Sequence, residues 1–371
     1  MTVINAKVGS GKYPVLVSDN SINELIDFCD GYSQENVVCI VDEFFKENDN
    51  SLYNELNIFL AKYKCLYLPG GLQSKGLEAY SLAMKWLLDI KLPRDGVIVA
   101  IGGGVIGDLS AFVASTYMRG TGLVLVPTTT TSMIDSAIGG KTGINFQDQV
   151  NAIGTYYNPK AVFMDVRFLL TLNTRDYFAG ICEAIKMSVT SDAAQAKKLL
   201  NNSTLLASNN REIASLVDLV IWSTKIKLFH VGDDPNEKGI RLTLNYGHTF
   251  GQSIETFYGL YQDHYRHGEA VALGMICAAS AINSINQSSL SSDLLDFTKK
   301  ILKQYNLPVL ISDQPDCLFP SVEVLVNNLI NDKKRTSQGN RFVLVPSIGT
   351  SIIQYIDNKK VIASSFQSIM P

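Results

Sequence analysis

The chain has 371 residues, of which 46% are hydrophobic and 18% charged, and its formal net charge is −3 at pH 7. A chain of this size buries large cores and is expected to form two domains. The small negative charge, without a dense basic cluster, excludes a general attraction to nucleic acid.

Two further features concern the cellular compartment. No charged segment followed by a long apolar run opens the sequence, and no stretch of about 18 uninterrupted apolar residues occurs later, so we expect a cytoplasmic protein without a membrane partner. The six cysteines have no paired spacing. They are Cys29, Cys39, Cys65, Cys182, Cys277 and Cys317. We expect reduced, mostly buried thiols rather than a disulfide framework or a zinc ribbon.

Short apolar runs alternate with helical patterns up to about residue 170. The runs are residues 35–42, 64–69, 96–101 and 123–127. Leu82, Trp86 and Leu87 belong to a helix between two of them. This alternation predicts a largely parallel sheet with crossover helices. We therefore expect an α/β nucleotide-binding domain over residues 1–170.

Helical periodicity dominates after residue 170. The predicted helices include residues 179–189, 213–229, 249–258 and 267–285. Small residues in the last of these predict close helix packing. Residues 341–350 and 351–356 resemble short, peripheral strands. The pattern predicts a mainly α-helical domain over residues 171–371.

The run GGGVIGD, residues 102–108, follows a predicted strand and opens a helix. Amide groups at a helix N-terminus attract anions, and glycines let a pyrophosphate approach the backbone. This favours a dinucleotide site that includes Gly103, Gly104 and Asp108, although a purely structural turn has the same glycines.

Polar residues at two other predicted strand ends extend this hypothesis. Asp42 ends one strand, where a carboxylate accepts hydrogen bonds from a ribose diol, and Thr128 and Thr129 follow another. Asp42 is equally suited to capping the segment after it.

The segment GGKTGIN, residues 139–145, carries Lys141 shortly after Asp135. A glycine pair lets the backbone approach a ligand, and the lysine supplies a point charge for an anionic substrate. The alternative is a tight turn with a solvated lysine.

Glu183, His248 and His267 lie in or at the start of three predicted helices. Two histidines and a glutamate form a catalytic zinc set with an open coordination position. Their spacing does not distinguish this set from histidines satisfied in a core. The other two of the four histidines, His230 and His264, lack a flanking glycine and receive no role.

Eight segments together resemble the dehydroquinate synthase family, in the family's order. They are residues 102–108, 114–120, 127–136, 139–145, 182–186, 237–255, 267–275 and 332–334. The family is a group of sugar phosphate cyclases with an NAD-binding α/β domain and a helical metal-binding domain, and its members are usually homodimers.

The resemblance implies roles for individual residues. The metal ligands for Zn or Co would be Glu183, His248 and His267. The catalytic polar groups would be Asp135, Lys141, Lys186, Lys227, Arg241 and Asn245. Substrate contacts would come from Asn151, Gln252, Lys333 and an Arg119 that reaches from the partner subunit. The NAD contacts would be Asp42, Lys75, Gly103, Gly104, Asp108, Thr128 and Thr129.

The implied reaction converts 3-deoxy-D-arabino-heptulosonate 7-phosphate, a sugar acid phosphate, to 3-dehydroquinate and phosphate in the shikimate pathway. NAD transiently oxidises an alcohol, which acidifies the neighbouring C–H and allows phosphate to leave. The hydride then returns, and an intramolecular aldol step closes the ring.

Three positions depart from the family pattern. Val150 stands where a lysine usually precedes Asn151, Gln252 replaces a histidine, and Leu72 replaces a carboxylate. They keep open a paralogous cyclase acting on another sugar phosphate, such as sedoheptulose 7-phosphate. Two other classes remain as alternatives: a metal-dependent glycerol or alcohol dehydrogenase, and a non-catalytic binding protein.

Overall fold

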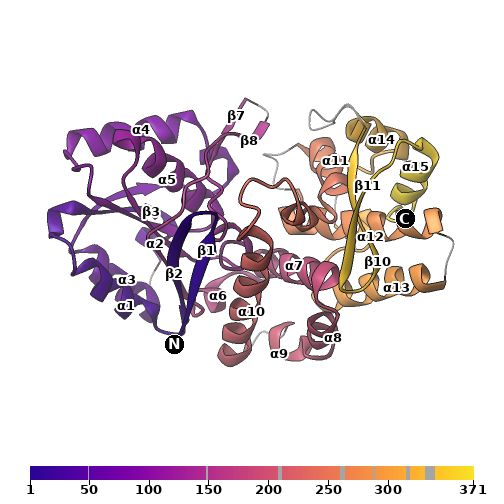
Figure 1. Cartoon of the computed structure of the whole chain (residues 1–371), viewed down its shortest axis with the longest axis horizontal. Helices are drawn as coiled ribbons and strands as arrows, with labels where there is room; N and C mark the ends of the chain where they lie inside the picture. Colours follow the sequence, from indigo (N-terminus) through magenta and orange to yellow (C-terminus); the bar gives the residue numbers. More distant parts are fainter. Residues whose placement is uncertain are drawn as a thin grey trace. The chain divides into compact units, whose positions relative to one another are not determined.

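The computed structural model describes residues 1–48, 50–147, 149–207, 211–259, 264–286, 289–314, 318–330 and 339–371. The chain divides into two compact units (Figure 1). The first contains Met1–Asn173 and Glu212–Asn236, and the second contains Thr174–Arg211 and Glu237–Pro371. The first crossing lies close to the predicted boundary at residue 170. The predicted single boundary does not include the later segment Glu212–Asn236, which also belongs to the first unit.

A seven-stranded sheet forms the centre of the first unit, in the order β1-β2-β9-β6-β5-β3-β4. Its strands are β1 (Thr2–Val8), β2 (Gly11–Ser18), β3 (Val37–Asp42), β4 (Lys64–Leu68), β5 (Val97–Gly102), β6 (Gly122–Pro127) and β9 (Ala161–Asp165). Only β1 pairs antiparallel, with β2. The four predicted strands and their parallel pairing are confirmed, because apolar runs such as β5 are buried along their whole length.

Helices cover both faces of this sheet, with α4 and α5 on one face and α1 and α3 on the other (Figure 1). The helical segments are α1 (Ser21–Cys29), η1 (Gln34–Asn36), α2 (Phe44–Glu47), α3 (Ser51–Leu60), η2 (Leu72–Ser74), α4 (Leu77–Asp89), α5 (Gly104–Thr116), η3 (Tyr117–Arg119), η4 (Ser132–Ser136) and α6 (Phe168–Thr171). A small antiparallel pair, β7 (Ile144–Phe146) and β8 (Gln149–Ile153), follows η4.

Helix α10 (Ile213–Val231) also belongs to the first unit. It packs against η4, β1 and β2, and the amide of Gly9 donates to the carbonyl of Gly232 just after it. The sequence predicts this helix correctly as a local element. Its packing partners lie far away in sequence, so periodicity alone does not assign it to a unit.

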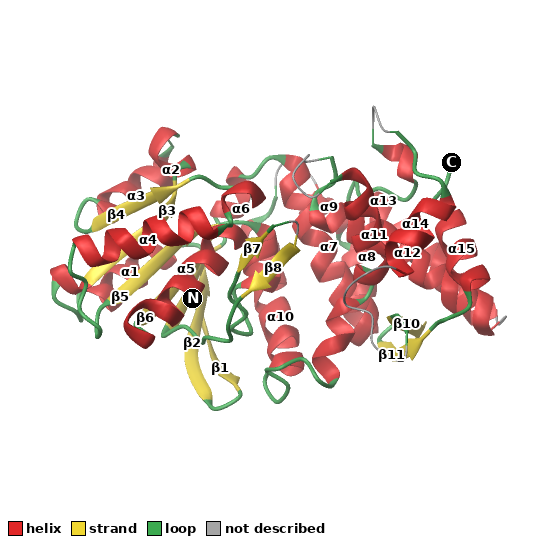
Figure 2. Cartoon of the chain, turned by 90° about the horizontal axis from the view of Figure 1, so that it is seen from above, coloured by secondary structure: helices red, strands yellow, loops and turns green. Residues whose placement is uncertain are grey.

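The second unit is mainly helical and has one strand pair, β10–β11, beside the helices (Figure 2). Its elements are α7 (Thr174–Ser191), α8 (Ala193–Asn201), α9 (Ser203–Ala207), η5 (Ile240–Asn245), α11 (His248–Tyr258), α12 (His267–Asn286), α13 (Ser289–Gln304), η6 (Ile311–Asp313), α14 (Val322–Ile330), β10 (Arg341–Ser347), β11 (Thr350–Tyr355) and α15 (Lys359–Gln367).

Helix α12 packs against α7, α11, α13 and α15. Two glycines make this packing close. A Cβ on Gly268 would lie 1.8 Å from the carbonyl oxygen of Ala179, and a Cβ on Gly274 would lie 2.0 Å from that of Gly247. Any side chain there would force the helices apart, so Gly268 and Gly274 serve helix packing.

Residues 267–285 of α12 are long and apolar enough to cross a membrane by length and composition. However, 78% of the most apolar window is buried inside the structure, as in the core helix of a folded domain.

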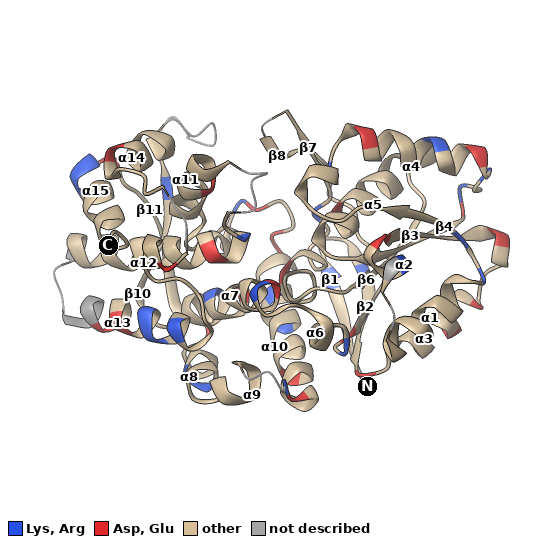
Figure 3. Cartoon of the chain, turned by 180° about the vertical axis from the view of Figure 1, so that it is seen from behind, with Lys and Arg blue, Asp and Glu red and all other residues tan. Residues whose placement is uncertain are grey.

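Lys and Arg positions are dispersed along both units (Figure 3).

Candidate active site

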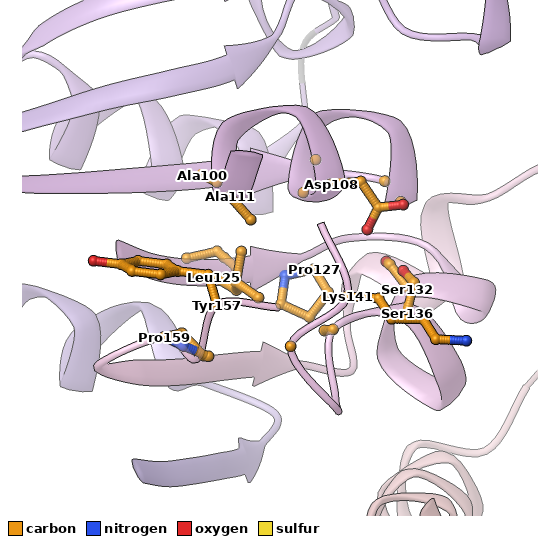
Figure 4. Close-up of a pocket in the computed structure, with 17 residues that line it drawn as sticks. Ala100, Asp108, Ala111, Leu125, Pro127, Ser132, Ser136, Lys141, Tyr157 and Pro159 are labelled. Carbon is orange, nitrogen blue, oxygen red and sulfur yellow. The ribbon is translucent and has the colours of Figure 1, made fainter. Parts of the chain in front are cut away.

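A pocket of about 400 Å³, including its open mouth, lies in the first unit beside the glycine run. Asp108, Ser132, Ser136 and Lys141 lie on one side of it, and apolar side chains including Leu125 lie on the other (Figure 4). A pocket with one polar and one apolar wall suits a ligand that joins phosphate groups to a flat ring.

The glycine run brings backbone rather than side chains to this pocket. β5 ends at Gly102, and α5 begins at Gly104 with Gly103 as its N-cap, without a side-chain cap. A Cβ on Gly103 would lie 3.0 Å from Cγ2 of Thr129, and one on Gly104 would lie 3.1 Å from Oγ of Ser136. The helix N-terminus is therefore suited to an anion.

Thr128 and Thr129 form the turn opposite the glycine run. The amide of Thr128 donates to the carbonyl of Gly102, at 3.0 Å. Thr129 and Ser132 cap each other, because the amide of Thr129 donates to Ser132 Oγ at 3.0 Å and the amide of Ser132 donates to Thr129 Oγ1 at 3.2 Å. The π-helix η4 follows, a form common at functional sites, and it carries Asp135.

Lys75 is buried at the centre of a polar network in the first unit. Its Nζ donates to Asp108 Oδ2 at 2.6 Å and to Asn151 Oδ1 at 2.5 Å. The amide of Asn151 in turn donates to Asn145 Oδ1 at 3.0 Å. Burial raises the pKa of Asp108, and the charge of Lys75 opposes that rise. Three predicted residues, Lys75, Asp108 and Asn151, are thus brought together.

Asp42 caps the segment that follows β3, and its contact with a ribose stays a prediction. Its Oδ1 accepts a hydrogen bond from the amide of Phe44 at 3.1 Å, which starts α2. A Cβ on Gly70 would lie 2.8 Å from its other oxygen, Oδ2, so a larger residue there would displace this carboxylate. Burial raises the pKa of Asp42.

The remaining predicted residues of the first unit differ in environment. Lys227, on α10, forms a salt bridge with Asp135 and has a side chain only 7% exposed. Lys141 lines the pocket and pairs with Tyr156 in an isolated backbone bridge. Arg119 is exposed and has φ of +65°.

The second unit brings Glu183, His248 and His267 together. One potential ligand atom from each lies within 4.8 Å of the others. Nε2 of His267 lies 3.3 Å from Nε2 of His248 and 3.9 Å from Oε1 of Glu183. This is the spacing of atoms that share one metal ion.

The outer atoms of the same residues have their own partners. His248 Nδ1 lies 3.2 Å from the carbonyl oxygen of Tyr246, and His267 Nδ1 lies 2.9 Å from Oε1 of Glu255. Lys186 donates to Glu183 Oε2. Such partners fix each imidazole so that Nε2 points at the metal.

The environment of Glu183 Oε1 shows whether a cation fits between these three residues. It is buried and has no hydrogen-bond partner in the structure. A buried carboxylate oxygen without a partner is costly, and a divalent cation held by Glu183 and both Nε2 atoms would satisfy it. The residues therefore fit a metal with three protein ligands.

The pKa of His267 reports the same electrostatic environment. Loss of hydration lowers this pKa, but the carboxylates of Glu255 and Glu183 raise it more, to about 9. The cluster attracts positive charge, whether a proton or a metal ion.

An ion pair and a glycine contact hold α12 against α7 near the cluster. Arg175 contacts both carboxylate oxygens of Glu269 at 2.7 Å, and Glu269 lies two residues after His267. Together with Gly268 against Ala179, this pair sets the separation of the helices that carry Glu183 and His267.

Other predicted residues of the second unit lie around η5 and α11. Arg241 is buried, with 2% exposure, and Asn245 Nδ2 donates to Glu237 Oε1 at 2.5 Å. Gln252 is half-buried, one helical turn after His248. Lys333 lies outside the described residues.

The histidines without an assigned role lie in packed environments. His230 is 1% exposed, and its Nδ1 lies 2.7 Å from the carbonyl oxygen of Ile226. His264 stacks on Tyr258, with ring centroids 4.4 Å apart.

Sequence analysis missed Glu255 and Glu237 as functional candidates. Glu255 lies seven residues after His248 on α11, and a seven-residue spacing returns to the same helix face. This periodicity was the available signal for Glu255. No comparable signal singles out Glu237, whose pairing with Asn245 depends on a backbone with φ of +57°.

Known proteins resemble this chain over most of its length. Residues 65–179 match the family 3-dehydroquinate synthase N-terminal, and residues 180–335 match 3-dehydroquinate synthase C-terminal. The 3-dehydroquinate synthase of Geotalea uraniireducens is 34% identical over 359 residues, 95% of each chain. That of Geobacter metallireducens is 38% identical over 296 residues, 80% of this chain and 79% of the relative.

Two solved structures share the fold. A 2-deoxy-scyllo-inosose synthase complexed with carbaglucose-6-phosphate, NAD⁺ and Co²⁺ is 23% identical, covers 99% of both chains and has a TM-score of 0.82. A 2-epi-5-epi-valiolone synthase from Streptomyces hygroscopicus, with NAD⁺ and Zn²⁺ bound, is 22% identical over 98% of both chains, with a TM-score of 0.84. Since the curated relatives match across nearly the full length of the chain, it belongs to the 3-dehydroquinate synthase family.

Proposed function

We propose that this chain is a carbon–oxygen lyase that converts 3-deoxy-D-arabino-heptulosonate 7-phosphate to 3-dehydroquinate and phosphate. The near full-length likeness to relatives named 3-dehydroquinate synthase supports this substrate. The structural observation that carries the proposal is the unpartnered, buried Oε1 of Glu183 beside two histidine Nε2 atoms. Two cyclases that share the fold are named with Co²⁺ or Zn²⁺ bound, which supports a cation at this position.

The cofactors are NAD and a divalent metal, Zn or Co. When bound, they supply reversible hydride transfer and Lewis-acid polarisation of a substrate oxygen. Glu183, His248 and His267 would hold the metal. The pocket at Gly103 and Gly104 would hold the nucleotide. The proposed cofactor contacts are Asp42, Lys75, Gly103, Gly104, Asp108, Thr128 and Thr129.

The polar residues supply binding and charge stabilisation. The substrate carries a carboxylate and a phosphate, and cations fixed in low-dielectric surroundings stabilise such charges strongly. Lys227 and Lys186 are buried and each is held by a carboxylate, and Arg241 is also buried. We assign these three, with Lys141, to the anionic groups of the substrate.

The neutral and acidic residues would orient the substrate. Asn245 is held by Glu237, and Asp135 is held by Lys227. Fixed side chains of this kind lower the entropy lost when a substrate is positioned. Asn151, Gln252 and Lys333 complete the proposed substrate contacts.

The assembly and location are part of the same proposal. We propose a cytoplasmic homodimer in which Arg119 reaches the substrate of the other subunit. Its exposed position at the end of η3 supports that contact. Residues 1–170 would bind NAD, and residues 171–371 would bind the metal and substrate.

A paralogous cyclase acting on another sugar phosphate is the second candidate. Val150, Gln252 and Leu72 favour it, because they remove charged or titratable groups from the family pattern. The curated relatives at 34% and 38% identity favour the seven-carbon acid instead.

The decisive experiment combines purified protein, NAD, Zn²⁺ or Co²⁺ and a panel of sugar phosphates. We expect phosphate release and carbocycle formation from the seven-carbon acid phosphate, without accumulation of NADH. Turnover of sedoheptulose 7-phosphate alone would establish the second candidate. Growth of NADH in step with substrate loss would establish a dehydrogenase instead.

A further inference from the structure

Two cysteines face each other on neighbouring strands of the first unit. Cys39 on β3 is the registered partner of Cys65 on β4, in a parallel pair. Both are free thiols. Registered residues of neighbouring strands point to the same face of a sheet, about 4.8 Å apart. Disulfides span Cα separations of roughly 4.4–6.8 Å, so the backbone permits a bond between this pair.

The two thiols differ in access to solvent. Cys39 is fully buried, whereas Cys65 is half-buried on β4, the last strand of the sheet. Cys65 Sγ lies 3.5 Å from the carbonyl oxygens of Leu60 and Tyr63. A small oxidant can therefore reach Cys65 first, and Cys39 lies beside it on the neighbouring strand.

The pKa values of the two thiols are shifted in opposite directions. The pKa of Cys65 is lowered because the Cys39 thiol hydrogen-bonds to it. Burial raises the pKa of Cys39 well above its ordinary value. Cys65 is thus the better nucleophile, and Cys39 is the thiol in register beside it that can resolve what forms on it.

We propose that Cys39 and Cys65 form an oxidative modification site, at which hydrogen peroxide converts the two thiols into a reversible disulfide between β3 and β4. The site is independent of the proposed function, because it uses none of the residues assigned to cofactor, metal or substrate.

The chemistry balances in two steps. The Cys65 thiolate attacks peroxide, forming an S–O bond as the O–O bond breaks, and the departing hydroxide takes a proton to become water. The sulfur is now a sulfenic acid. Cys39 then attacks that sulfur, forming the S–S bond as the S–O bond breaks, and its proton leaves with the hydroxide as a second water. Two thiols and one peroxide give one disulfide and two waters.

The bond would join strands that lead to the cofactor pocket. β3 ends at Asp42, and Gly70 follows two residues after the end of β4, where a Cβ would lie 2.8 Å from the Asp42 carboxylate. Cys65 is half-buried on the last strand of the sheet, so a bond at this position is accessible to reductants, and exposed disulfides are the labile ones. This predicts a reversible modification rather than a permanent staple.

The test uses the full chain with Cys317→Ser, which removes the one cysteine outside the described residues. Parent, Cys39→Ser, Cys65→Ser and Cys29→Ser proteins are treated with hydrogen peroxide, alkylated under denaturing conditions and mapped by peptide mass spectrometry. Cys29 is the matched control, since it is 1% exposed and burial raises its pKa to about 12. Circular dichroism verifies that each variant is folded, and Cys39→Ala replaces Cys39→Ser if the latter is not.

We expect a Cys39–Cys65 cross-linked peptide in the parent and in Cys29→Ser, and its complete reversal by dithiothreitol. In Cys39→Ser, Cys65 should instead be trapped as a sulfenic acid by dimedone. In Cys65→Ser, the rate of thiol loss should fall about tenfold, because the reactive thiolate is gone. Equal thiol loss in the parent and Cys65→Ser would overturn the proposal, as would a folded parent that loses thiols without the cross-linked peptide.

Discussion

The two units differ in whether one buried carboxylate is fully paired. In the first unit the cations and carboxylates neutralise each other, as in the pairs Lys75–Asp108 and Lys227–Asp135. In the second unit, Glu183 keeps one oxygen without a partner, facing two imidazoles. In the first unit these charges are already paired, and the pocket and the backbone amides of the glycine run remain for a ligand. In the second unit the Glu183 oxygen gains a partner only when a cation binds. Substitutions in the two units should therefore have different consequences.

The largest effect is expected from removing a metal ligand. His248→Ala leaves a site with two ligands. Loss of a residue that only orients a metal ligand lowers metal affinity by up to about 100-fold, so loss of a ligand itself should lower the affinity for Zn²⁺ by more than that. Metal content after dialysis, measured by plasma mass spectrometry, tests this without recourse to activity. His264→Ala is the matched control in the same unit and should retain its metal. Full metal occupancy in His248→Ala would refute the ligand assignment.

The opposite response is expected in the first unit. Lys75→Met breaks a buried ion pair and leaves Asp108 without its cation, which should cost about 3 kcal/mol of unfolding free energy. Both tryptophans, Trp86 and Trp222, belong to this unit, so tryptophan fluorescence during urea denaturation reports its unfolding. Metal binding should be unchanged. An unaltered denaturation midpoint would show that the pair contributes nothing to this unit.

The same variant gives a pH test. Burial already raises the pKa of Asp108 above its ordinary 3.8, so the folded state holds the proton more tightly than the unfolded chain. As pH rises above 3.8, ionisation of Asp108 therefore lowers the free energy of unfolding. Without Lys75 the pKa rises further. The destabilisation by Lys75→Met should be smallest at acidic pH and largest at neutral pH, and a loss that grows on acidification would contradict this assignment.

A residue that contacts a ligand without binding the metal should have an intermediate effect. Glu255→Gln replaces the carboxylate on His267 Nδ1 with a neutral amide, and metal affinity should fall by about 10–100-fold. Competition with a chromophoric chelator measures this. Glu323→Gln, an exposed substitution on α14, is the control. An affinity equal to that of the control would remove Glu255 from the site.

The smallest effect concerns the backbone of the nucleotide pocket. Gly107 lines the pocket within α5, and a Cβ there would meet nothing within 4 Å. Gly107→Ala should stabilise the helix by about 0.5–1 kcal/mol, because glycine is unfavourable in a helix interior. The added methyl group would occupy pocket space, so NAD affinity should fall, as measured by calorimetry. A simultaneous gain in both quantities would place NAD elsewhere.

The sequence predicts the first unit's sheet well, because strands such as β5 are fully buried and appear as continuous apolar runs. The glycine run and Thr128–Thr129 follow directly from their positions at strand ends. The hairpin β1–β2 is harder, since its strands alternate buried and more exposed residues instead of forming continuous apolar runs. Its position at the edge depends on pairing with β9, far away in sequence.

The metal cluster is not determined by local pattern. His248 and His267 begin different helices, and Glu183 lies on a third. Only the family resemblance connects them beforehand. What brings them together is close packing at Gly268 and Gly274 and the Arg175–Glu269 pair, and these are tertiary contacts without a periodic signal. The glycines beside the histidines were visible in the sequence, but their role in helix packing was not.

The return of α10 to the first unit constrains biosynthesis. A ribosome releases the chain in order, and domains generally fold as units during synthesis. Residues 1–173 lack α10, which packs against β1, β2 and η4, so the first unit is incomplete until residue 236 has emerged. By then the segment Thr174–Arg211 of the second unit is also outside the ribosome, with the rest of its unit still to come. Helix α7, with its buried Glu183 and Lys186, must therefore wait for partners that are synthesised last.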